Sequence, residues 1–326
     1  MKTFVKVVLV IVAVMVLVAG AGVGYLFAKY PDVPPPEDLT VTATPEKIAR
    51  GEYLAKSVSQ CVDCHAVRDF TKYAGPVVEG TLGRGGENFG IPGTSVRALY
   101  SKNITPAGIG HWTDGELIRA ITAGVNKDGE PLFPIMPYPR YAKMSREDIE
   151  AIVAYVRTLA PLEYTAPPRD LAMPLPLVVR TLPRAPGFRP IPPKTDRVAY
   201  GEYMTNAASC AECHTPMDGQ GTPLPGMDFA GGFEFPLAGG GVVRSANITP
   251  DADSGIGTWS EQQFIDKFKA FAGTPARVLT PAEQRENTVM PWLTYADMTV
   301  EDLGAMYAYL RTLKPILNRV PKHQPR

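Results

Sequence analysis

The stretch Cys61-Val62-Asp63-Cys64-His65 returns in the second half of the chain as Cys210-Ala211-Glu212-Cys213-His214. The chain has 326 residues, with four cysteines and four histidines. Every cysteine and half of the histidines therefore fall within these two pentapeptides. Chance placement does not explain such a concentration, so the chemistry of the chain is expected at these two positions.

A Cys-x-x-Cys-His sequence is the pattern that covalent attachment of c-type haem requires. Its two thiols add across the vinyl groups of the porphyrin, and the adjacent histidine is held where its imidazole ligates the iron from one side. The two-residue gap lets one helical turn present both sulfurs and the ring to one haem face. The sequence thus predicts two covalently bound haem c groups, attached through Cys61, Cys64, Cys210 and Cys213, with His65 and His214 as axial ligands.

The cysteines admit two other interpretations. A four-cysteine zinc site needs its pairs much closer than the 145 residues that separate Cys64 from Cys210, and it leaves both histidines unexplained. A thioredoxin-type redox dithiol stays open for one motif, although the βαβ pattern that accompanies such dithiols is missing.

The sixth iron ligand in electron-carrying cytochromes is commonly a methionine. Two methionine pairs recur: Met136 with Met290, and Met144 with Met298. Met144 and Met298 stand just before a helix cap, which is the place of a hydrophobic staple. Met136 and Met290 lie in loops and precede proline, which holds their backbone extended. We therefore predict Met136 and Met290 as the iron ligands.

The duplication extends well beyond the haem motifs. In each repeat a Gly-Glu-Tyr segment precedes the motif, an Asn-Ile-Thr-Pro block and a Gly-Ile-Gly-x-Trp block follow, and a Met-Pro segment and a Tyr-x-Arg-Thr-Leu helix come last. The recurring tryptophans, Trp112 and Trp259, are read either as core residues or as donors to a haem propionate. A backbone carbonyl from the loop after each histidine is expected to orient its imidazole.

The repeats divide the chain into six segments. These are an anchor at 1–30, a stalk at 31–45, a first domain at 46–161, a Pro-rich linker at 162–196, a second domain at 197–315 and a tail at 316–326. The linker holds nine prolines and is predicted to be an extended spacer. The alternative is that it packs across the domains through its leucines.

Within each repeat the periodicity predicts an all-α fold. A helix is expected over 45–57, capping boxes begin helices at Thr113 and Ser260, and Ser145 and Thr299 cap the last helix of each repeat. The segments 67–102 and 215–246 are rich in glycine and proline and show no strand alternation. Long loops of this kind are uncommon in a self-sufficient core, so a cofactor is expected to fill the space around them.

The N-terminal residues predict export. An uncharged apolar run from Val7 to Phe27 follows Lys2 and Lys6, and its 21 residues would span about 31 Å as a helix, close to the ~30 Å core of a bilayer. The basic residues before the run favour a cytoplasmic N-terminus. A retained single-pass anchor in the inner membrane, with the haem domains on the periplasmic side, is preferred over a cleaved signal peptide because the run stays apolar through Phe27.

Charge and composition exclude one class of partner. Lys plus Arg and Asp plus Glu number 33 each, so the formal net charge is zero. A nucleic-acid partner is therefore not expected.

These residues together resemble two tandem class I cytochrome c domains. More narrowly, the Asn-Ile-Thr-Pro and Met-Pro blocks resemble the cytochrome c subunits of membrane-bound alcohol, aldehyde and gluconate dehydrogenases. The resemblance implies electron relay from a dehydrogenase subunit toward quinone or a terminal oxidase, and it implies Met136 and Met290 as axial ligands. The chain itself is then an electron carrier and not an enzyme. Two departures are that such subunits typically carry three haem domains and that the second repeat has an insert near 275–287, which is predicted to be a docking surface.

Two alternative functions remain. One is a di-haem, peroxidase-like enzyme in which one iron keeps an open position, although both repeats offer the same methionine. The other is the cytochrome subunit of an oxidase.

Overall fold

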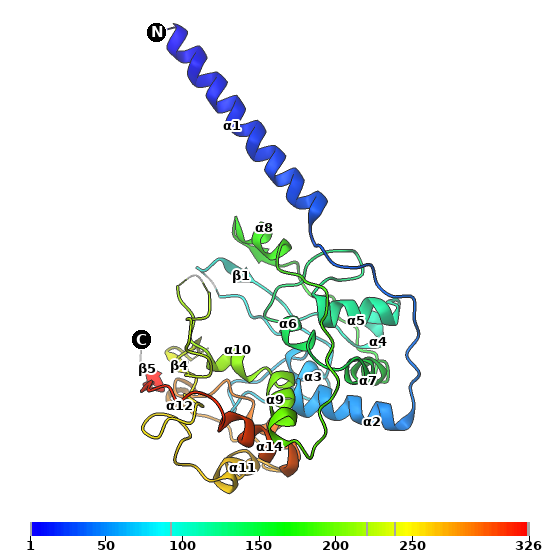
Figure 1. The fold of residues 1–326 in the computed structure, drawn as a ribbon, viewed down its shortest axis with the longest axis vertical. Coiled ribbons are helices and arrows are strands. Elements are labelled where there is room, and N and C mark those ends of the chain that lie inside the picture. The colour runs from blue at the N-terminus through cyan, green and yellow to red at the C-terminus, as the bar shows by residue number, and fades with distance from the viewer. Residues whose placement is uncertain (1, 92, 220, 238, 325–326) are drawn as a thin grey trace.

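A computed structural model describes residues 2–91, 93–219, 221–237 and 239–324 of the chain. The structure is mostly helical, as predicted (Figure 1). The helices of the N-terminal half are α1 (Lys2–Lys29), α2 (Pro45–Tyr53), the π-helical turn η1 (Leu54–Val58), α3 (Cys61–Cys64), α4 (Pro106–Ile109), α5 (Asp114–Ala123), α6 (Tyr138–Tyr141) and α7 (Arg146–Val156). Those that follow are α8 (Leu175–Arg180), α9 (Arg197–Ala207), α10 (Cys210–His214), α11 (Glu261–Lys269), α12 (Pro281–Gln284), α13 (Trp292–Tyr295) and α14 (Val300–Leu310).

In the part of the chain that the structure describes, the all-α prediction missed five short strands. They are β1 (Val96–Ala98), β2 (Asp170–Leu171), β3 (Glu234–Pro236), β4 (Val242–Arg244) and β5 (His323–Gln324). Strand β1 pairs antiparallel with β2, and β4 lies between β3 and β5 in a second antiparallel sheet. Each strand has two or three residues, which is too short for an alternating pattern to appear in the sequence.

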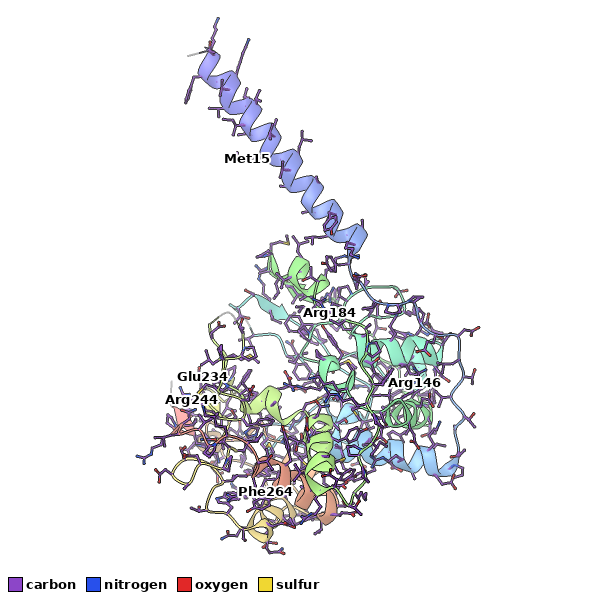
Figure 2. The ribbon with its side chains drawn as sticks, viewed as in Figure 1. Met15, Arg146, Arg184, Glu234, Arg244 and Phe264 are labelled. Carbon is purple, nitrogen blue, oxygen red and sulfur yellow. The ribbon has the colours of Figure 1, made fainter. Side chains whose placement is uncertain are left out.

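Helix α1 projects away from the rest of the molecule, and none of its described side chains is buried (Figures 1 and 2). With 28 residues, the helix is long and apolar enough to cross a membrane. Proline and threonine residues follow it, and the segment 31–44 then runs along the body of the molecule. There the Glu37 carboxylate accepts two hydrogen bonds from Arg146, at 2.7 and 2.8 Å.

Each repeat is built on a pair of crossed helices, α2 with α7 and α9 with α14. The crossing points are Gly51 and Gly201. A Cβ atom placed on Gly51 would lie 1.8 Å from the carbonyl oxygen of Ala151, and one on Gly201 would lie 1.9 Å from that of Ala305. Glycine is therefore what allows the backbones to touch, which is a steric and not a conformational use of this residue.

The predicted helix starts are confirmed in detail. Thr113 and Ser260 each form a capping box with the residue three positions on. Ser145 and Thr299 accept hydrogen bonds from the backbone N–H of Asp148 and Asp302 and so cap α7 and α14. The helix expected over 45–57 forms as α2 and η1, with a wider π-helical last turn.

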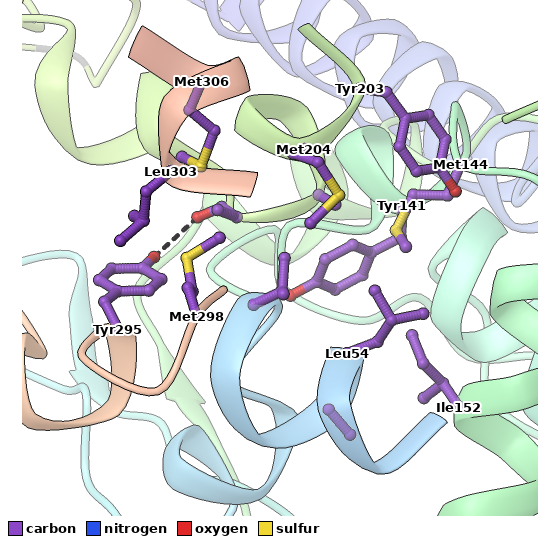
Figure 3. Packing of buried hydrophobic residues seen from close by; sticks show 14 of the residues in the cluster. Leu54, Tyr141, Met144, Ile152, Tyr203, Met204, Tyr295, Met298, Leu303 and Met306 are labelled. Carbon is purple, nitrogen blue, oxygen red and sulfur yellow. Dashed lines mark hydrogen bonds between the residues drawn. The ribbon is translucent and has the colours of Figure 1, made fainter. Parts of the chain in front are cut away.

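The two repeats share one hydrophobic core. A single cluster of buried side chains includes Leu54 and Ile152 from the first repeat together with Met204 and Leu303 from the second (Figure 3). Polar contacts also cross between the repeats, since the Ser59 hydroxyl donates to the carbonyl of Ala207 at 3.1 Å. The two halves are consequently packed against each other and are not separate domains joined only by a linker.

The prediction of an extended spacer at 162–196 is wrong in part. Strand β2 and helix α8 both lie in this segment, and Val179 is fully buried. Arg169 donates to the carbonyl of Pro131 at 2.7 Å, which ties the segment to the first repeat. The prolines do not prevent helix α8 because Pro174 is its N-cap and Pro176 stands in its first turn, where no N–H is needed. The packed alternative is therefore the better description.

The insert of the second repeat binds the first repeat. The N–H of Tyr73 donates to the carbonyl of Arg277 at 2.9 Å. The side chain of Asn287 donates to the carbonyl of Lys72 at 3.0 Å and accepts the N–H of Ala74 at 3.1 Å. The two ends of the insert thus clasp, through these hydrogen bonds, the loop at residues 72–74 of the first repeat. Docking of another protein on its outer, exposed residues stays a prediction.

Candidate functional site

The two cysteine motifs lie on short helices, α3 and α10. The residue directly before each helix has a strained backbone conformation that sets the direction of the helix. Gln60 and Ser209, which directly precede Cys61 and Cys210, have φ values of 53° and 55°. A non-glycine residue in this left-handed region costs energy and persists only where its surroundings enforce it. The recurrence of the same strain at the same position indicates that both helices are held in a set direction by the fold.

Both motifs open onto one cavity of about 2210 Å³. Pockets for drug-sized ligands are about 300–1,000 Å³, so this cavity is more than twice the usual size. The side chains of Cys64 and Cys213 have exposed area although they lie deep inside the molecule, because that area faces the cavity. Its walls contain the residues predicted as haem ligands and attachment points, namely Cys61, Cys64, His65, Met136, Cys210, Cys213, His214 and Met290.

Each motif histidine is oriented by a backbone carbonyl. Nδ1 of His65 lies 2.6 Å from the oxygen of Lys102, and Nδ1 of His214 lies 2.7 Å from that of Ala246. Nδ1 is therefore assigned as the N–H donor, and Nε2 keeps its lone pair for a metal. Burial lowers the pKa of both rings, which favours the neutral form that a metal requires. The expected orienting carbonyls are thus identified at the last residue of each Gly- and Pro-rich loop.

The Asn-Ile-Thr-Pro block explains how that carbonyl is placed. The side chain of Asn103 donates to the carbonyl of Leu162 at 2.7 Å and accepts from the N–H and hydroxyl of Thr105 at 2.9 and 2.7 Å. Asn247 repeats all three bonds, with Ile316 and Thr249, at the same distances. Each asparagine directly follows the carbonyl that orients a histidine. No role for these residues follows from the sequence, and their strict recurrence is the signal that marks them.

The two methionine pairs occupy different environments. Met136 and Met290 are half-buried and line the cavity. Met144 and Met298 are fully buried within the hydrophobic cluster, as the staple interpretation predicts (Figure 3). Met306 also faces the cavity, but the corresponding position in the first repeat is Ile152. Only Met136 and Met290 therefore combine recurrence with access to the cavity among the described residues.

The recurring tryptophans and the two histidines outside the motifs lie in different places. Trp112 and Trp259 are half-buried and line the cavity. Their position is compatible with both readings of these residues. His111 is exposed on the surface, and His323 pairs with Val243 in the small sheet. Neither histidine competes with the motif histidines for a place in the cavity wall.

Each motif is also held by the opposite repeat. The Thr294 hydroxyl of the second repeat hydrogen-bonds the carboxylate of Asp63, inside the first motif. Reciprocally, Arg140 of the first repeat binds the carboxylate of Glu212, inside the second motif, at 2.5 Å. Arg140 and Thr294 stand four residues after Met136 and Met290. The two sites therefore meet at the interface between the repeats. There the cysteine motif of each repeat contacts the segment that follows the Met-Pro loop of the other repeat.

The thiol chemistry argues against a redox dithiol. Burial raises the pKa of Cys61, Cys210 and Cys213 to about 12 and that of Cys64 to about 11. A reactive dithiol needs a lowered thiol pKa, because the thiolate is the nucleophile. In the part of the chain that the structure describes, moreover, no three His, Cys, Asp or Glu side chains could hold a metal ion.

Comparison with known proteins agrees with this geometry. Over 293 residues the chain is 30% identical to the alcohol dehydrogenase (quinone) cytochrome c subunit of Gluconacetobacter polyoxogenes, covering 82% of this chain and 56% of that protein. It is 34% identical to the corresponding subunit of Gluconobacter oxydans over 68% of this chain and 46% of that protein. A diheme cytochrome c-type protein of Cereibacter sphaeroides is 28% identical, with 78% and 82% covered. No family model matches the chain.

The chain is homologous to these c-type cytochromes. It spans about half the length of the dehydrogenase cytochrome subunits that it matches. Haem c and electron transport follow from this relationship. The cavity fits such a group, because its cysteine side chains face open volume, its histidines have a free Nε2 and its walls are mostly apolar.

Proposed function

We propose that this cytochrome carries one haem c in each repeat and passes single electrons from a dehydrogenase partner toward quinone or a terminal oxidase. Cys61 and Cys64 would attach one haem, and Cys210 and Cys213 the other. His65 with Met136, and His214 with Met290, would ligate the two irons. The observation that carries the proposal is that all eight of these residues line one cavity, in two sets that recur residue by residue.

The bound haem supplies the one-electron chemistry of its iron, and the residues of this chain tune and protect it. The Lys102 and Ala246 carbonyls fix the direction of each imidazole and raise its basicity as a ligand. The proline after each methionine limits the motion of the thioether. Apolar walls exclude water and, together with methionine ligation, favour a raised reduction potential.

Two features support transfer between the two haems. Cys64 and Cys213 face the same cavity, so the two attachment points open into one continuous space. The bonds of Thr294 with Asp63 and of Arg140 with Glu212 tie the two sites together across the repeat interface. Because the core is continuous between the repeats, the distance between the haems would be held constant, and a constant distance keeps the transfer rate constant.

For the cellular location, we propose a single-pass protein of the inner membrane. Helix α1 would span the bilayer with Lys2 and Lys6 on the cytoplasmic side, and the cavity-bearing body would lie on the periplasmic side. The location supports the electron-carrier role, since c-type haem is attached outside the cytoplasm. A dehydrogenase and a quinone or oxidase would then both be within reach at that surface.

The test is to express the full chain in a host that matures c-type cytochromes and to measure the mass of the protein. We expect the polypeptide mass plus two haems, and insensitivity of the pigment to acid–acetone extraction. Replacing Cys61 and Cys64 together by alanine should remove one haem and about half of the visible absorbance. A mass equal to that of the bare polypeptide would refute the proposal.

A second measurement separates the carrier from the enzyme alternatives. The reduced wild-type protein should bind carbon monoxide slowly or not at all, because each iron would have two protein ligands. Rapid binding at one haem would favour a peroxidase-like enzyme with one open site. Copurification from solubilised membranes would identify whether a dehydrogenase or an oxidase is the partner.

A further inference from the structure

Helix α8 lies directly beside the end of helix α1 at which the chain enters the body (Figure 1). The guanidinium of Arg180, the last residue of α8, stands 4.4 Å from the centre of the Phe27 ring. Its Nη2 also donates to the carbonyl of Phe27 at 3.3 Å. Phe27 is the last apolar residue of the α1 run. Any segment packed on it is therefore at the level where α1 leaves the hydrocarbon core.

The segment around α8 exposes apolar side chains that the rest of the body does not cover. Met173 is 69% exposed, Val178 47% and Leu182 38%. Ile91, which is 41% exposed, belongs to the same edge, because its N–H donates to the carbonyl of Val96 in β1, the strand that pairs with β2. We call Ile91, Met173, Val178 and Leu182 the apolar edge. Clustered exposure of this kind marks an interaction surface.

The charges on this segment are of one sign. Residues 171–189 contain three arginines, Arg180, Arg184 and Arg189, and no aspartate or glutamate, although the whole chain is neutral. Arg184 is exposed and follows Arg180 by four residues. Large apolar side chains next to arginines, beside the end of a membrane-spanning helix, are the composition of a segment that lies in the bilayer interface. Arginines there attract the anionic headgroups of lipids.

We propose that the apolar edge, together with Arg180 at the end of α8 and Arg184 just after it, inserts into the surface of the same bilayer that α1 would span. The apolar side chains would enter the boundary between headgroups and acyl chains, and Arg180 and Arg184 would bind lipid phosphates. This inference rests on the proposed retention of α1 as a membrane anchor. A single helix leaves the body free to rotate on its stalk, whereas a second contact fixes which face of the cavity-bearing body looks toward the membrane.

The experiment uses the full-length holoprotein in liposomes of phosphatidylcholine and phosphatidylglycerol. Because the four native cysteines would be bonded to haem in the holoprotein, a single introduced cysteine takes a nitroxide label uniquely. Met173→Cys reports on the apolar edge. Val300→Cys is the matched control, since Val300 is 56% exposed and lies on α14 at the end of the body opposite α1 (Figure 1). Val16→Cys reports on the anchor.

The readout is the collision of each label with lipid-soluble oxygen and with a water-soluble nickel chelate. We expect the oxygen-to-nickel ratio at position 173 to exceed that at position 300 several-fold and to fall when phosphatidylglycerol is omitted. Equal ratios at 173 and 300, with a lipid-like ratio at 16, would overturn the inference and leave the anchor intact. A water-like ratio at 16 would remove the anchor and the inference together. Shielding of position 173 only after a dehydrogenase is added would assign the edge to a protein partner and overturn it as well.

Discussion

The Tyr53 hydroxyl of α2 in the first repeat hydrogen-bonds the carboxylate of Asp302 at the start of α14 in the second repeat, 249 residues away. The same hydroxyl accepts the N–H of Thr299 at 3.1 Å. The second repeat makes the same contacts with the first. The Tyr203 hydroxyl donates to the carboxylate of Asp148 at 2.6 Å and accepts the N–H of Ser145 at 3.1 Å. Each half therefore completes the N-terminal cap of the other half's last helix.

This exchange predicts that the repeats unfold together. Tyr53→Phe and Tyr203→Phe should each lower the free energy of unfolding by about 1–3 kcal/mol, because a buried carboxylate and an N–H lose a partner. Burial and the bond to Asp302 raise the pKa of Tyr53, so the donor stays protonated over the working range. Guanidinium unfolding of the holoprotein measures the change. Tyr25→Phe is the control, because Tyr25 lies on α1, outside the core that the two repeats share.

The glycine crossings predict a larger effect. Gly51→Ala and Gly201→Ala should each cost about 3 kcal/mol or more, since a Cβ there would overlap a carbonyl oxygen of the facing helix and force the pair apart. Gly187→Ala is the control, because it has an ordinary backbone conformation and no atom within 4 Å of the added Cβ. Thermal unfolding by circular dichroism distinguishes them. Equal melting temperatures for all three variants would contradict the helix crossing.

The methionine assignment predicts different effects for the two pairs. Met136→Ala and Met290→Ala should each lower the potential of one haem and open one carbon monoxide site per protein, with the other haem unchanged. Met144→Ala should leave both potentials in place and cost about 2–5 kcal/mol of stability, because it removes a fully buried side chain. Spectroelectrochemical titration separates the outcomes. An unchanged titration of the Met136 variant would reject that ligand.

The clasp of the insert predicts a local effect on the first repeat. Asn287→Ala removes the hydrogen bonds that its side chain makes with the carbonyls of Phe70 and Lys72 and with the N–H of Ala74. We expect a loss of about 1–3 kcal/mol and faster hydrogen exchange at Ala74 and its neighbours. Glu286→Ala removes the exposed neighbouring side chain and serves as the control. Exchange that is unchanged in the Asn287 variant would show that the clasp is open in solution.

The local chemistry of this protein was readable from its sequence. Both Cys-x-x-Cys-His motifs, the methionine pairs, the helix caps at Ser145 and Thr299, and the apolar run of α1 depend on residues that are neighbours along the chain. Helix capping, the spacing of two cysteines and a histidine, and helix length are short-range properties, so sequence spacing alone specifies them. Where long-range packing was involved, the outcome differed, as α8 and the five short strands show.

The tertiary structure decided how the two repeats face one another. Nothing in the sequence indicates that Thr294 meets Asp63, that Arg140 meets Glu212, or that the carbonyls of Lys102 and Ala246 are the ones that orient the histidines. These contacts join residues tens to hundreds of positions apart, and no local pattern records which surfaces pack. Duplication determined that there are two similar sites, and only the burial of a common core determined that they open into one cavity.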